Sequence, residues 1–120
     1  MKLRTVIKLP TYSCEVVFIV VDSVAEEAGK LYKKYKLKDE FGDEAEGAVL
    51  MLDTDKYYLL IGSTYLSHNT LAHEIYHAVV RVTEDRGIVE EEAQAWLVGH
   101  LTGVIYKFLE KKNLTITHGR

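Results

Sequence analysis

Two histidines four residues apart flank a glutamate in the segment TLAHEIYHAVVRV, at positions 70–82. On an α-helix, residues i and i+4 lie on the same face one turn apart, so His73 and His77 can direct both imidazoles toward one point. Zinc binds imidazole nitrogens at about 2.0–2.1 Å. Glu74 is rotated by about 100° from His73, which places its carboxylate beside the metal rather than on it. The spacing therefore predicts Zn²⁺ bound by His73 and His77, with Glu74 as a catalytic general base.

The same spacing could arise by chance in a chain with five histidines, or the two rings could be hydrogen-bonded core residues. The surrounding residues argue against both interpretations. Apolar side chains of this segment form one stripe that can face a core, which leaves the histidine face for another use. The stripe consists of Leu71, Ile75, Val79 and Val82.

A catalytic zinc site has three protein ligands and one open position for water. The next candidates are on a later predicted helix that begins with three glutamates. Glu92 shares a helix face with Trp96 and with two glycines, Gly99 and Gly103, which would allow the neighbouring helix to approach closely. We therefore expect Glu92 to be the third ligand, with Glu91 as its main rival. The other glutamates of the run would complement the helix dipole.

His100 lies two helical turns beyond Glu92 on roughly the same face. It could be a zinc ligand, a partner of a ligand, or a hydrogen-bond donor to the oxyanion of a transition state. Helical spacing does not separate these roles, so we keep His100 as a second catalytic candidate. Three tyrosines are further candidates for stabilising the oxyanion: Tyr65, Tyr76 and Tyr106.

Four short segments have the patterns of β-strands. Residues 3–9 alternate between apolar and polar, and Pro10 ends this strand because proline cannot donate to a ladder. Residues 15–21 form a continuous β-branched run, typical of a strand buried on both faces, and we expect it to pair with the first. Residues 48–53 and 57–62 flank a short polar turn and predict a β-hairpin.

Three helices are predicted around these strands. A capping box at Ser23 begins an amphipathic helix over residues 24–36. Ser67 is the expected N-cap of the helix with the histidines, and Gly87 its C-terminal stop. Apolar residues nearly encircle the last helix, at about residues 90–112, so we expect it to be central to the core.

The composition limits the class of protein. A chain of 120 residues with 48% hydrophobic content suits one domain, spanning residues 1–120. A net charge of −3, with no basic stripe beyond the lysines of residues 30–38, argues against nucleic-acid binding. The single Cys14 excludes an internal disulfide and a thiolate-rich zinc site. Neither a signal peptide nor a membrane span is evident, so we expect a cytoplasmic protein, and the oligomeric state stays open.

HEIYHA, a short connection and EEAQAWLVGHL together resemble the small phage- and prophage-encoded zincin-like proteins, over about residues 65–110. In those proteins His-Glu-x-x-His-Ala precedes a helix that begins Glu-Ala-x-Ala-aromatic-Leu. The chain is more distantly similar to gluzincin metallopeptidases and to the peptidase domain of the ImmA/IrrE group. The resemblance implies that His73, His77 and Glu92 bind zinc and that Glu74 is the base. For a phage-encoded protein it also implies a location in the host cytoplasm.

We therefore expect an α+β, minimal zincin-like fold with element order ββαββαα and a small sheet of about four strands. The expected activity is hydrolysis of a peptide or protein substrate, in which Glu74 takes a proton from zinc-bound water. Residues 57–62 would be the edge strand that holds an extended peptide, and the acidic loop 37–47 could border the cleft. The alternatives are a non-catalytic zinc-binding interaction or regulatory module on the same fold, and a domain without metal.

Overall fold

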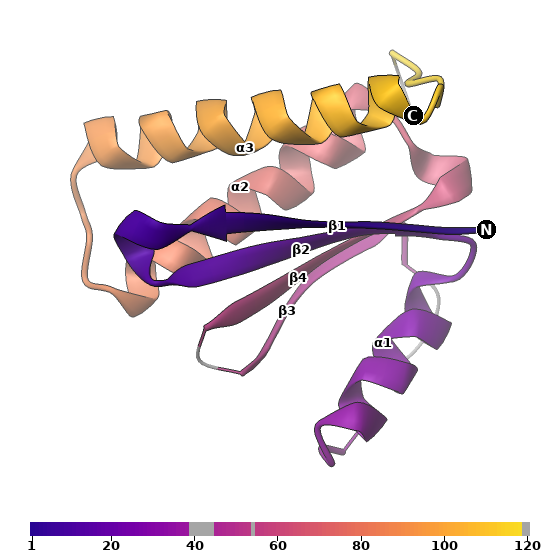
Figure 1. Cartoon of the computed structure of the whole chain (residues 1–120), viewed down its shortest axis with the longest axis horizontal. Helices are drawn as coiled ribbons and strands as arrows, with labels where there is room; N and C mark the ends of the chain where they lie inside the picture. Colours follow the sequence, from indigo (N-terminus) through magenta and orange to yellow (C-terminus); the bar gives the residue numbers. More distant parts are fainter. Residues whose placement is uncertain (39–44, 54, 119–120) are drawn as a thin grey trace.

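The protein consists of a four-stranded mixed sheet and three α-helices (Figure 1). This computed structural model describes residues 1–38, 45–53 and 55–118. The order ββαββαα confirms the α+β fold expected from the sequence. The strands are β1 (Lys2–Leu9), β2 (Cys14–Val21), β3 (Gly47–Asp53) and β4 (Lys56–Gly62).

Three α-helices and two short 3-10 helices complete the described structure. None of the described helices has the length and the apolar character needed to cross a membrane. The α-helices are α1 (Val24–Lys34), α2 (His68–Asp85) and α3 (Glu91–Lys111), and the 3-10 helices are η1 (Pro10–Tyr12) and η2 (Ser63–Tyr65).

The strands lie in the order β1-β2-β4-β3. Strands β1 and β2 are antiparallel, as are β3 and β4, which confirms the two pairings expected from the sequence. Between them β2 and β4 run parallel, with residues 15–21 opposite residues 56–62. The expectation that the YYLLIG strand lies at the edge is therefore wrong. Its side chains are buried on both faces, which requires neighbours on both sides, and the edge strand beside it is β3.

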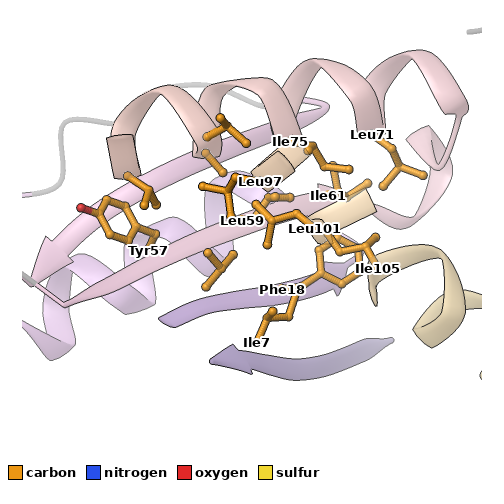
Figure 2. Close-up of a cluster of buried hydrophobic side chains, with 14 of the residues drawn as sticks. Ile7, Phe18, Tyr57, Leu59, Ile61, Leu71, Ile75, Leu97, Leu101 and Ile105 are labelled. Atoms are coloured by element: carbon orange, nitrogen blue, oxygen red, sulfur yellow. The ribbon is translucent and has the colours of Figure 1, made fainter. Parts of the chain in front are cut away.

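Helices cover both faces of the sheet: α1 lies on one face, and α2 and α3 lie on the other (Figure 1). Alternate side chains of the central strands supply two cores. Phe18 and Leu59 pack under α2 and α3, whereas Leu60 packs under α1. Figure 2 shows the larger core, which Ile75 of α2 and Leu101 of α3 complete. Full burial of each such side chain contributes about 1.5–3 kcal/mol to stability.

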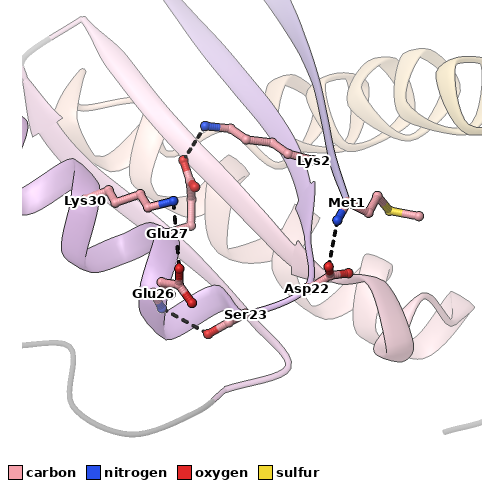
Figure 3. Close-up of polar contacts among 7 residues, drawn as sticks. All are labelled: Met1, Lys2, Asp22, Ser23, Glu26, Glu27 and Lys30. Atoms are coloured by element: carbon pink, nitrogen blue, oxygen red, sulfur yellow. Dashed lines mark hydrogen bonds and ion pairs between the residues drawn. The ribbon is translucent and has the colours of Figure 1, made fainter.

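Polar contacts fix the start of α1 (Figure 3). Ser23 Oγ accepts a hydrogen bond from the backbone N–H of Glu26, which confirms the predicted N-cap. Lys2 Nζ lies 2.9 Å from Oε2 of Glu27, a buried carboxylate, so that α1 is tied to β1. The helix ends at Lys34, two residues before the predicted end.

The helix with the histidines is bounded as the sequence predicted. Ser67 Oγ accepts from the backbone N–H of Thr70 at 3.1 Å, and Gly87 adopts a φ of 67° just after the helix. At this end Tyr57 Oη of β4 donates to Asp85 Oδ2 at 2.6 Å, and Arg86 donates to Tyr57 Oη at 2.8 Å. These contacts anchor α2 to the centre of the sheet and so fix which of its residues face solvent.

Helix α3 lies on the surface of the core rather than at its centre, so this expectation was wrong. Only one stripe of its residues is fully buried, whereas Trp96 is 59% exposed. Helix α3 has the sheet and α2 on one side only, so apolar residues around its whole circumference cannot all be covered. The stripe consists of Leu97, Leu101, Ile105 and Leu109.

Candidate metal centre

The histidine pair, His73 and His77, lies on the exposed side of α2, one helical turn apart. Their Nε2 atoms are 3.2 Å apart, and the ring planes meet at 77°. Two ligands of a tetrahedral zinc ion at 2.0–2.1 Å are separated by about 3.3–3.4 Å. The two nitrogens, which also lie within hydrogen-bonding distance of each other, are therefore close to the separation that a shared zinc ion requires.

Glu74 points away from the exposed side of the helix, toward β3. Its side chain is 9% exposed, and its Oε2 lies 3.9 Å from His73 Nε2. A Cβ added to Gly47 would lie 2.8 Å from Glu74 Cγ, so the first residue of β3 leaves room for this side chain only because it is glycine. The structure thus places a buried carboxylate beside the histidine pair.

The surroundings of Glu74 raise the pKa of its carboxyl. Burial raises the pKa of the Glu74 carboxyl above its ordinary value, His73 lowers this pKa, and the carboxylate of Glu46 raises it further. Burial has the largest effect, because a carboxylate loses hydration when it leaves water. A carboxylate whose pKa is raised is a stronger base, which suits it to accept a proton.

An open cavity of about 390 Å³ lies beside Glu74. One wall is the start of β3, with Glu46 just before it, and the other is the first part of α2. The acidic loop that the sequence placed near a cleft ends at this wall, and residues 39–44 of that loop lie outside the described residues. The lining consists of Glu46, Gly47, Asn69, Thr70, His73 and Glu74.

Glu46 is the residue of this site that the sequence did not single out. Its backbone carbonyl accepts from Gly62 N at 2.8 Å, and its Oε1 accepts from Thr70 Oγ1 at 3.2 Å. Thr70 is in turn held by the N-cap residue Ser67. In the sequence, the feature that could have identified Glu46 is its position directly before Gly47, the glycine that begins β3.

The described residues contain no group of three or more histidine, cysteine, aspartate or glutamate side chains that could hold a metal ion. Glu92, its rival Glu91 and His100 are therefore not brought to the histidine pair in this structure. Contrary to expectation, no neighbouring helix approaches Gly99 or Gly103 among the described residues, because a Cβ added at either would meet nothing within 4 Å. Both glycines and Glu92 are exposed, on the side of α3 away from its buried stripe.

The oxyanion candidates lie apart from the cavity. The His100 ring stacks on Trp96, with ring centres 5.0 Å apart, and Tyr106 Oη lies 2.7 Å from Nδ1 of His68. Tyr65 and Tyr76 are exposed. Within the described part of the chain, the cavity lining includes none of the four candidates.

A comparison of the chain with protein-family models, with curated proteins and with solved structures found no significant match. The chemistry of this site must therefore be inferred from the side chains that form it. Imidazole nitrogen is a preferred zinc ligand, and His73 and His77 offer two such nitrogens at ligand spacing. These residues fit a zinc ion as two of its ligands.

Proposed function

We propose that the protein is a zinc-dependent metallopeptidase, with zinc held by His73 and His77 and with Glu74 as the general base. The observation that carries the proposal is the 3.2 Å separation of the two Nε2 atoms, beside a buried carboxylate 3.9 Å from one of them. The chemistry that bound zinc would supply is Lewis-acid activation of water and of a peptide carbonyl.

Glu74 would take a proton from the attacking water and hand it to the nitrogen of the departing amine. Its raised pKa supports this role, since a carboxylate that holds a proton more tightly removes one from water more readily. The substrate would be an extended peptide or protein segment. Strand β3, which within the described residues pairs on one side only, would offer it backbone hydrogen bonds next to the cavity.

Glu92 remains our proposed third ligand, on the basis of the sequence resemblance, with Glu91 and His100 as the alternatives. His100 also remains a proposed catalytic group, as a donor to the oxyanion. Measurement of zinc affinity in three variants would distinguish these candidates for the third ligand. The variants are Glu92→Gln, Glu91→Gln and His100→Ala. We expect Glu92→Gln to weaken binding and the other two to leave it unchanged.

The test begins with protein purified without a histidine tag and analysed for zinc. We expect about one zinc per chain, together with cleavage of some members of a peptide library. Glu74→Gln should keep the zinc and lose at least about 100-fold in cleavage rate, because it cannot accept the proton. Glu84→Gln, an exposed glutamate on the same helix, is the matched control. A metal-free wild type, or full activity of Glu74→Gln, would contradict the proposal.

The second candidate is a zinc-binding interaction or regulatory module without turnover. The absence of a third protein ligand among the described residues favours it, because catalytic zinc sites use three. Bound zinc without cleavage of any peptide in the library would identify this function. For either function we propose a cytoplasmic location, because the one cysteine, Cys14, is a free thiol.

A further inference from the structure

The histidine pair offers a zinc ion two ligands and faces solvent. His73 and His77 bring their Nε2 atoms within 3.2 Å of each other, and the His73 side chain is 63% exposed. The described residues form no group of three or more metal-binding side chains. Zinc takes four ligands, three of them from the protein in catalytic sites and all four in structural sites. While α3 keeps the orientation seen here, further ligands for an ion on this pair must come from outside the chain.

The surface of α2 around the pair has the composition of an interface. Between residues 69 and 80 the only acidic or basic residue besides the histidines is Glu74, and it is buried. Tyr76, between the two histidines, is 62% exposed. The centre of a protein interface is depleted of charged residues and enriched in tyrosine. The exposed residues of this surface are Asn69, Ala72, His73, Tyr76 and His77.

A second copy of the chain is the partner that fits this surface. Its own histidine pair has the same separation, so a single association supplies two further ligands to the ion. Two uncharged surfaces also meet without burial of an unpaired charge. With the ion on a twofold axis the contact is isologous, so it closes at two chains and does not extend into a filament.

We infer that two copies of the chain share one zinc ion through His73 and His77 of each copy, and that this dimer is a resting state of the proposed enzyme. The inference rests on the proposed binding of zinc by the pair and adds regulation of that site. Four protein ligands leave no open position for water, so the shared site does not hydrolyse peptides. Excess zinc separates the dimer by mass action, because each chain then takes an ion of its own. Glu92 remains the proposed third ligand of the one-zinc chain.

The test follows the mass of the protein while zinc is added stepwise. Metal-free protein without a histidine tag is held at one concentration and studied by sedimentation velocity. We expect monomers without zinc, the most dimer near about half an equivalent of zinc per chain, and monomers again in excess zinc. Native mass spectrometry should find one zinc ion in each dimer. Peptide cleavage, measured on the same samples, should appear only at zinc concentrations at which the dimer separates.

Two variants divide the ligands from the surface around them. His73→Ala removes one ligand from each copy and should abolish the zinc-dependent dimer. Ala72→Lys keeps both ligands and places a positive charge on each of the facing surfaces. We expect it to weaken dimerisation at least about fivefold through like-charge repulsion, while the dilute, monomeric chain binds zinc nearly as the wild type does.

Leu37→Lys is the matched control, because it adds the same charge at a position that is 47% exposed, just beyond the end of α1. Helix α1 lies on the other face of the sheet, so this variant should dimerise like the wild type. A thermal unfolding midpoint near that of the wild type, measured without metal, verifies that each variant is folded.

Several results would overturn the inference: zinc binding without a dimer, a dimer with one ion per chain, or a dimer that persists in His73→Ala or in excess zinc. The peptidase proposal would survive each of them if the one-zinc chain cleaves peptides. A one-ion dimer that separates in excess zinc, without any cleavage, would overturn the peptidase proposal and leave the shared site intact. A chain that binds no zinc would contradict both.

Discussion

His73 and His77 bring their Nε2 atoms within 3.2 Å of each other on the exposed side of α2, and we propose that each is a zinc ligand. Substitution of either by alanine should weaken zinc binding at least about 100-fold, since even the loss of a group behind a ligand costs about 10–100-fold. Competition with a zinc chelator measures the affinity. His118→Ala, in the C-terminal segment, is the control and should leave the affinity unchanged. Wild-type affinity in His73→Ala would show that zinc, if bound, lies elsewhere.

Glu74 combines a buried position with a raised pKa, and this combination predicts how metal-free protein responds to pH. Below the ordinary carboxyl pKa the group is neutral in both the folded and the unfolded protein. As the pH rises through the higher native pKa, the folded protein must hold a buried charge, so stability is lost. Glu74→Gln stays neutral throughout.

Glu74→Gln should therefore unfold at the same temperature as the wild type near pH 4 and at a higher temperature at pH 8. Thermal unfolding in the presence of a chelator, at several pH values, measures the difference. Glu84→Gln, at an exposed position, should show no such pH-dependent gain. A Glu74→Gln variant that is less stable than the wild type at pH 8 would mean that the carboxylate has a stabilising partner.

At the scale of the elements, the approach of β3 to α2 depends on one residue. A Cβ at Gly47 would lie 2.8 Å from Glu74 Cγ and 2.9 Å from the backbone oxygen of Leu60, and that oxygen cannot move easily. Gly47→Ala should therefore destabilise the protein by about 1–3 kcal/mol, as overpacked positions do.

Gly99→Ala is the contrasting variant, on the exposed face of α3, where the added Cβ meets nothing within 4 Å. It should stabilise the protein by about 0.5–1 kcal/mol, because alanine loses less backbone entropy than glycine in a helix. Chemical denaturation of both variants measures the two effects. If Gly99→Ala were destabilising, α3 would have to be packed on the face that the structure leaves open.

The element boundaries were predictable because each has a local signal. Ser23 and Ser67 cap α1 and α2 through bonds to residues three positions ahead, and Gly87 stops α2 with a positive φ. Which strand of the hairpin lies at the edge was not predictable in this way, because residues 48–52 and residues 57–61 are both unbroken apolar runs. In the structure residues 57–61 are buried without interruption, which is typical of a central strand, whereas residues 48–53 include partly buried and exposed positions.

At the scale of the whole molecule, Cys14 reports on global unfolding, because it lies in the core under α2 and α3. Burial raises the pKa of its thiol, so that little reactive thiolate is present near pH 8. We expect a disulfide reagent to modify Cys14 at least about 100-fold more slowly in folded protein than in denaturant. Rapid modification of the folded protein would show that this end of the sheet opens without global unfolding.

The sequence by itself determined the histidine pair, its glutamate, and the order and most boundaries of the helices and strands, because spacing along one helix and caps at its ends are local properties. Only the tertiary structure decided that β3 is the edge strand, that α3 turns Glu92 and Gly99 to solvent, and that Glu46 joins Glu74 at one cavity. Periodicity indicates which residues of an element are buried. It does not indicate which distant element covers them, because strand order and helix rotation are set by contacts between residues far apart in the chain.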